Sequence, residues 1–74
     1  MVKVLNLKVE SIQDKTRVVV VDLVADTKEE VTACGTSGAN VVGLSDHDIM
    51  VLGSMALCAD GSFGMLDSAG QWKF

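Results

Sequence analysis

The chain of 74 residues contains no proline and no tyrosine, and its three aromatic residues all lie in the last twelve positions. Apolar residues make up 49% of the chain, but they are mainly Val, Leu, Ala and Met, which can fill only a thin core. A chain of this length forms one domain at most, and small domains commonly need a disulfide, a metal or a partner chain. We therefore expect a single β domain over residues 1–74 that associates with copies of itself.

The sequence also has little positive charge, since six Lys and Arg against ten Asp and Glu give a net charge of −4. The basic residues are scattered, whereas nucleic-acid binding needs Lys or Arg that displace counterions from phosphates. No apolar run approaches the length of a membrane span. The first ten residues mix charged and apolar side chains, unlike a signal peptide. We expect a protein made in a bacterial cytoplasm that binds neither nucleic acid nor membrane.

The motifs of enzymes and metal sites are missing as well. Cys34 and Cys58 lack the short spacing of zinc ligands, and an acidic chain gives little support to a reactive thiolate. We expect both to be reduced thiols that act as small buried hydrophobes. His47 lies between Asp46 and Asp48, in what we interpret as a solvated acidic loop. The sequence therefore predicts no enzyme activity, no metal and no cofactor.

The first third of the chain has the period of two that is typical of strands. In "VKVLNLKVES", Leu5, Leu7 and Val9 alternate with other residues, which predicts a half-buried strand. A turn with Asp14 and Lys15 at its tip then leads into the next strand.

The segment "RVVVVDLVAD" predicts a second strand, because consecutive β-branched residues disfavour a helix and fit a pleated surface. One face would hold Val19, Val21, Leu23 and Ala25. The opposite face would hold Val18, Val20 and Val24, together with Asp22 and Asp26. Since both faces are partly apolar, we expect this strand to be central or covered by another chain, with the three valines at an interface.

Residues 27–34 are compatible with two structures. Thr27 and Glu30 have the spacing of a capping box, which would begin a short helix. The β-branched Val31 favours a strand, and Gly35 comes too early for a helix of usual length. We prefer a hairpin that leads into a strand, with the helix as the alternative.

The C-terminal third contains two turn signals. Asp60-Gly61 indicates a two-residue hairpin loop, and Ser68-Ala69-Gly70 indicates a three-residue loop with glycine at its left-handed position. Directly opposed residues share a face, so these loops determine which side chains come together. The resulting pairing gathers a set of large apolar residues, with Gly64 leaving room for a terminal ring: Met55, Leu57, Leu66, Trp72 and Phe74. We expect this set to form the core or an interface.

The same segment, "GLSDHDIMVLGSMALCADGSFGMLDSAGQWKF", resembles the ends of small proteins encoded among the head and tail genes of tailed bacteriophages and prophages, especially those of Firmicutes. The matching positions are Gly43-Leu44, Gly53-Ser54, Asp60-Gly61, Met65-Leu66-Asp67 and Gly70-Gln71-Trp72. The resemblance covers residues 43–74 and carries over no functional residues. It implies a non-enzymatic virion or phage-morphogenesis protein.

We therefore expect an all-β fold of about six antiparallel strands, a small sandwich or open barrel that ends in a three-stranded meander. The expected function is that of a phage virion structural or accessory protein: a capsid-decorating, head-fibre or tail accessory subunit. It would bind its own copies and a larger virion protein, such as a capsid or tail subunit, through an apolar sheet face and edge-strand addition. A soluble protein-binding adaptor or regulator is the alternative, and a cysteine-dependent enzyme is a third class.

Overall fold

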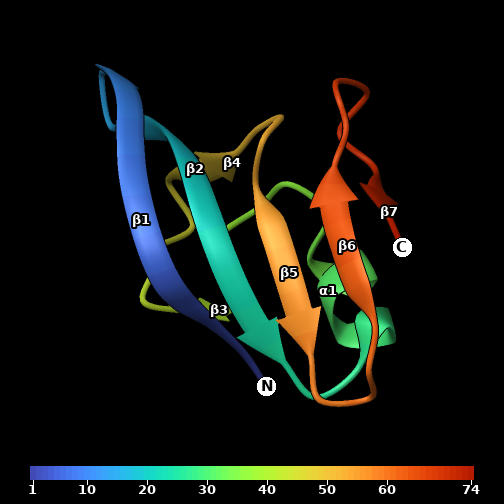
Figure 1. The fold of residues 1–74 in the computed structure, drawn as a ribbon. Coiled ribbons are helices and arrows are strands. Elements are labelled where there is room, and N and C mark those ends of the chain that lie inside the picture. Colours follow the sequence, from blue (N-terminus) through green and yellow to red (C-terminus); the bar gives the residue numbers. More distant parts are fainter.

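Seven strands and one short helix make up the computed structural model, which describes residues 1–74 (Figure 1). The elements are β1 (Val2–Gln13), β2 (Thr16–Ala25), α1 (Lys28–Cys34), β3 (Val41–Val42), β4 (Asp48–Met50), β5 (Met55–Cys58), β6 (Phe63–Leu66) and β7 (Trp72–Lys73). All strands belong to one open sheet in the order β3-β1-β2-β5-β6-β7, with β4 paired to β2. The predicted small all-β fold is confirmed, and its strands form a single mixed sheet that is not closed into a barrel.

The N-terminal hairpin follows the sequence prediction at its turn. Gln13 pairs with Thr16, so Asp14 and Lys15 form the tip between β1 and β2. The alternation along β1 is interrupted by two register shifts, at residues 5 and 10, which are β-bulges. Beyond its first residues β1 extends past the core. The strand itself is confirmed, but the prediction that it is half-buried is wrong, because Leu5, Leu7 and Val9 are all exposed.

Strand β2 lies at the centre of the sheet and has the two faces that its sequence predicts. Val19, Val21, Leu23 and Ala25 are buried against the elements that lie behind the sheet in Figure 1. They belong to a core of eleven residues: Val2, Val19, Val21, Leu23, Ala25, Val31, Val41, Met50, Ala56, Leu66 and Trp72. The residues between them in β2 are half-buried and point to the opposite face.

Residues 28–34 form helix α1, so the preferred hairpin was wrong and the capping-box alternative is correct. The Thr27 hydroxyl accepts a hydrogen bond from the backbone N–H of Glu30 at 3.3 Å, and the Glu30 carboxylate accepts one from the Asp26 N–H at 3.2 Å. Val31 is fully buried in the core, and this tertiary contact outweighs its strand propensity.

Two successive strands run parallel to β2 along the same edge. Residues 17–19 of β2 pair with β4, and residues 22–25 pair with β5. Ser54 fills the break between β4 and β5, where its hydroxyl accepts a hydrogen bond from the Val21 N–H at 3.1 Å. This side chain is fully buried, so a polar residue completes the ladder of the central strand.

The C-terminal meander exists as predicted, but the register of its first hairpin differs. The Cys58 N–H donates to the Ser62 carbonyl, which leaves a three-residue loop closed by Gly61 at a φ of 93°. The predicted two-residue loop was wrong, and a shift of one residue exchanges the faces. The second loop, ending in Gly70 at a φ of 79°, and the pairing of Leu66 with Trp72 are as predicted.

Candidate functional site

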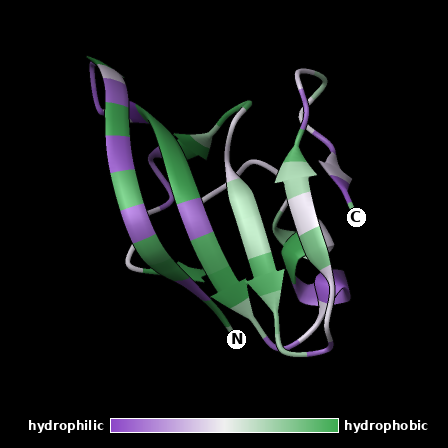
Figure 2. Cartoon of the chain, in the orientation of Figure 1, coloured by the Kyte–Doolittle hydropathy of each residue, from purple (hydrophilic) through white to green (hydrophobic).

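The sheet has one covered face and one face with no element in front of it (Figure 1). Helix α1 and the connections that carry β3 and β4 lie on the covered side. The strand registers place eight apolar side chains on the other side, and Leu5, at the first bulge, lines a hollow there with Met55 and Leu57. We call this side the open face; its nine apolar residues are Leu5, Val18, Val20, Val24, Ile49, Met55, Leu57, Phe63 and Met65. Figure 2 shows hydrophobic colouring along most of β2, β5 and β6, whereas hydrophilic and hydrophobic residues alternate along β1.

The apolar residues of the open face remain in contact with water. Leu57 and Phe63 oppose each other on β5 and β6, with 54% and 53% of their surfaces exposed. A hollow of about 140 Å³ lies beside Leu57, and it is also lined by Leu5, Asp22 and Met55. A contiguous apolar surface of this kind commonly marks a protein interaction site.

Charge is distributed unevenly between the two sides of the sheet. The open face carries three lysines, Lys3, Lys8 and Lys73, and two acidic residues, Glu10 and Asp22. The other eight of the ten acidic residues lie elsewhere, so the acidity of the chain is concentrated away from the open face. The face is therefore apolar, close to neutral and edged by lysines.

The predicted site residues separate into two groups. Val18, Val20 and Val24 lie half-buried on the open face, together with Met55 and the exposed Leu57. Leu66 and Trp72 are buried in the core on the covered side. The expectation that five large residues share one face is therefore wrong, because the observed register of β5 and β6 differs from the predicted one by one residue.

Phe74 is half-exposed on the covered side, where its ring lies over Gly64. A Cβ atom built on Gly64 would lie 2.5 Å from Cε2 of that ring. The predicted space for a terminal ring is thus present. Sequence reasoning missed Phe63, Met65 and Ile49 as open-face residues, and only the correct loop length after β5 could have indicated the first two.

The loop before β4 contains one buried carboxylate. Asp46 and His47 are exposed, but Asp48 is 1% exposed, so the interpretation of all three as solvated was wrong. Arg17 on β2 donates two hydrogen bonds to Asp48, and the Ser45 N–H donates a third at 2.9 Å. These donors lower the pKa of the Asp48 carboxyl to about 2 and more than offset the effect of burial. The group is an internal structural ion pair.

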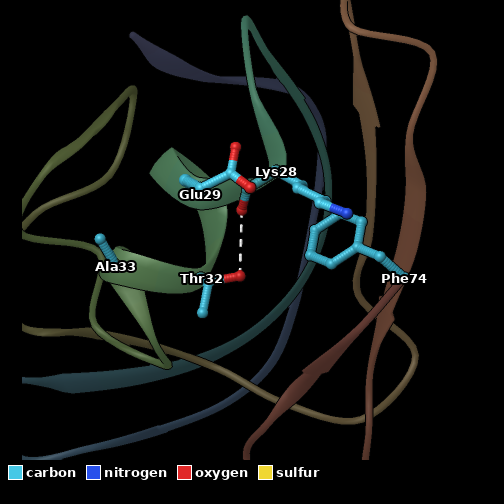
Figure 3. A pocket seen from close by; sticks show the side chains of 5 residues that line it. All are labelled: Lys28, Glu29, Thr32, Ala33 and Phe74. Atoms are coloured by element: carbon cyan, nitrogen blue, oxygen red, sulfur yellow. Dashed lines mark hydrogen bonds between the residues drawn. The ribbon is translucent and has the colours of Figure 1, made fainter.

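The largest hollow, of about 490 Å³, lies between α1 and the last residue (Figure 3). It is lined by Lys28, Glu29, Thr32, Ala33 and Phe74, all of which are exposed. One hydrogen bond joins two of these residues: the Thr32 hydroxyl donates to the backbone carbonyl of Lys28, one helical turn earlier. This bond is common for threonines inside helices and has no need of a ligand. The hollow contains no pair of groups arranged for proton transfer or nucleophilic attack.

The two cysteines are half-buried free thiols that pack against the core. Burial raises the pKa of both Cys34 and Cys58, and nearby carboxylates raise it further, so little thiolate forms at neutral pH. No three His, Cys, Asp or Glu side chains meet in an arrangement that could hold a metal ion.

The outer edge of β1 is a second surface with free backbone groups, since β3 pairs only with Val2 and Lys3. The bulges at residues 5 and 10 and the charges of Lys8 and Glu10 interrupt this edge. Bulges and edge lysines are devices that discourage strand addition. The open face, rather than this edge, is the candidate functional site.

No protein-family model, curated protein or solved structure matches the chain. No helix of the structure is long and apolar enough to cross a membrane.

Proposed function

We propose that the protein is a non-enzymatic structural or accessory subunit of a phage particle that acts by packing its open face against other protein subunits. The observation that carries this proposal is the open face itself, with nine apolar side chains on the uncovered side of the sheet. The resemblance of residues 43–74 to small proteins of phage head and tail gene clusters supplies the biological context.

The physical basis of binding is the removal of apolar surface from water, which contributes roughly 25 cal/mol for each Å². A second sheet packs at about 10 Å over an apolar sheet face, with the side chains of the two layers interdigitated. Leu57 and Phe63 are the most exposed opposed pair on the face, so a partner surface would bury most area there. Apolar side chains of this kind bind another surface, but they cannot transfer a proton or attack a substrate.

The proposal is tested with particles purified from a phage or induced prophage that carries the gene. We expect quantitative mass spectrometry to detect the chain in the particle. Leu57→Lys should reduce its incorporation by at least about tenfold, because a charge would be buried in the contact. The matched control is Ile12→Lys, which replaces an exposed apolar residue that pairs with Arg17 on the covered side.

Both variants must first retain the fluorescence emission of folded Trp72. Absence of the chain from the particle would refute the proposed function. Equal incorporation of wild type and Leu57→Lys would refute the role of the open face.

A further inference from the structure

Two cross-strand rows on the open face have a self-complementary arrangement. The first row runs through paired positions in the order Asp22, Met55, Met65 and Lys73. The row next to it runs through Val24, Leu57 and Phe63. Neighbouring strands are about 4.8 Å apart, so the acid and the lysine stand roughly 14 Å from each other at opposite ends of the first row.

The two charges at the ends of this row have no oppositely charged partner within the chain. Oδ2 of Asp22 accepts one hydrogen bond, from Asn6 Nδ2 at 3.2 Å, and Oδ1 accepts none. Nζ of Lys73 has one contact, with the Gln71 side-chain oxygen at 3.4 Å. If a purely apolar partner covered the face, Asp22 would become a buried unpaired charge, which is strongly unfavourable. A fitting partner therefore supplies a cation opposite Asp22.

We propose that the open face binds a second copy of this chain, related by a two-fold axis that runs along the strands between β5 and β6. This axis places Met55 opposite Met65 of the second copy, and Leu57 opposite Phe63 of the second copy. It also places Asp22 opposite Lys73 of the second copy, and the symmetry forms each contact twice. The charged ends of the row pair with each other, while the apolar middle forms the centre of the contact. The inference rests on the proposed binding role of the open face.

The available area suits a weak dimer. Under this axis four strands overlap, β2, β5, β6 and β7, over a width of roughly 19 Å. β5 and β6 have four residues each, so the overlap extends about 13 Å along the strands and each copy contributes a flat area of roughly 250 Å². This contact is at the small end of protein interfaces, so we expect a transient dimer that dissociates in the micromolar range. Two copies of the open face can approach each other because this face is close to neutral. Two copies of the acidic remainder of the surface would repel each other.

The test is sedimentation equilibrium of the purified chain with charge-swap variants. The wild type should dimerise, and Asp22→Lys or Lys73→Asp alone should weaken the dimer about tenfold or more, because each creates two like-charge contacts. The double variant Asp22→Lys/Lys73→Asp should return to within about threefold of wild type, since it restores both pairs in reverse. The controls Asp14→Lys and Lys15→Asp make the same charge changes at the hairpin tip and should leave the dissociation constant of the dimer unchanged.

A wild-type chain that stays monomeric at high micromolar concentration overturns the second-copy proposal, and so does a dimer that the double variant fails to rescue. The incorporation assay with Leu57→Lys separates this failure from that of the proposed function. If the chain is monomeric and Leu57→Lys is excluded from particles, the face binds a different subunit and the proposed function stands. If Leu57→Lys is incorporated normally, the open face has no role in the particle, and the charge-swap variants alone decide whether it binds a second copy.

Discussion

Arg17 and Asp48 are joined by two parallel hydrogen bonds, from Nε to Oδ1 at 2.7 Å and from Nη2 to Oδ2 at 2.8 Å. The carboxylate is almost completely buried, whereas the arginine keeps 36% of its side chain in solvent. A paired and hydrogen-bonded carboxylate can be buried in so small a core, while an unpaired one could not. The contact fixes the loop before β4 to the central strand.

This ion pair predicts a loss of stability in acid. The pKa of Asp48 is lowered from 3.8 to about 2, first by the hydrogen bonds from Arg17, and burial opposes the shift. Because the folded pKa is the lower one, the stabilisation is complete above about pH 4 and is lost as the pH falls towards 2. We expect the free energy of unfolding, measured with urea, to fall by about 2 kcal/mol over this range from Asp48 alone.

Two variants separate Asp48 from the other carboxylates that titrate in the same range. Asp48→Asn should be less stable than wild type at pH 5 and approach it near pH 2, because the titrating group is gone. Asp46→Asn removes an exposed neighbouring carboxylate and should follow the wild-type curve. Parallel curves for Asp48→Asn and wild type would contradict the assignment.

Local signals predicted the elements of this fold better than their pairing. The turn at residues 14–15, the two faces of β2 and the loop ending in Gly70 followed from turn chemistry and alternation. The loop ending in Gly61 has the same length, but Asp60-Gly61 is also the strongest signal for a shorter loop. Because the observed register differs from the predicted one by one residue, Met55 and Leu57 lie on the open face instead of the expected core side.

Long-range relationships left no local trace in the sequence. Arg17 and Asp48 are 31 positions apart, and neither has a neighbour that identifies the other as its partner. The parallel pairing of β4 and β5 with β2 joins segments separated by the helix and loops. The second apolar face of β2 did indicate an uncovered surface, but the residues of β5 and β6 that extend it depended on the register.

The contact between Phe74 and Gly64 predicts that Gly64→Ala destabilises the wild-type fold but stabilises the fold of Phe74→Ala. The three heavy atoms nearest to a Cβ on Gly64 all belong to the Phe74 ring, at 2.5 to 2.9 Å. In wild type, Gly64→Ala should destabilise the fold by about 1 kcal/mol or more, because the ring must move. In the Phe74→Ala background the same change should stabilise it by roughly 0.5 kcal/mol, since alanine is better than glycine within a strand.

Thermal or urea unfolding of the four proteins measures this cycle. Equal effects of Gly64→Ala in both backgrounds would show that the terminal ring does not occupy this position in solution.

The contacts of Trp72 predict that the third-last residue of the chain is essential for folding. The residue is 8% exposed, it pairs with Leu66, and its Nε1–H donates to the Gly35 carbonyl at the end of α1 at 2.8 Å. The side chain thus joins the last strand to the helix. Trp72→Ala should cost about 3–5 kcal/mol, a large part of the stability of a small domain. Trp72→Phe keeps most of the apolar contact and should cost less, although it leaves the Gly35 carbonyl without its donor.

Native Trp72 should emit at shorter wavelength than in denaturant, since it is the only tryptophan of the chain. Circular dichroism and urea unfolding measure the variants, with the exposed Gln71→Ala as a neighbouring control that should remain folded. The order of stability should be wild type, then Trp72→Phe, then Trp72→Ala, because the apolar contact is larger than the single hydrogen bond. A Trp72→Ala variant as stable as Gln71→Ala, or native emission that does not shift in denaturant, would show that the last strand does not hold the sheet to the helix.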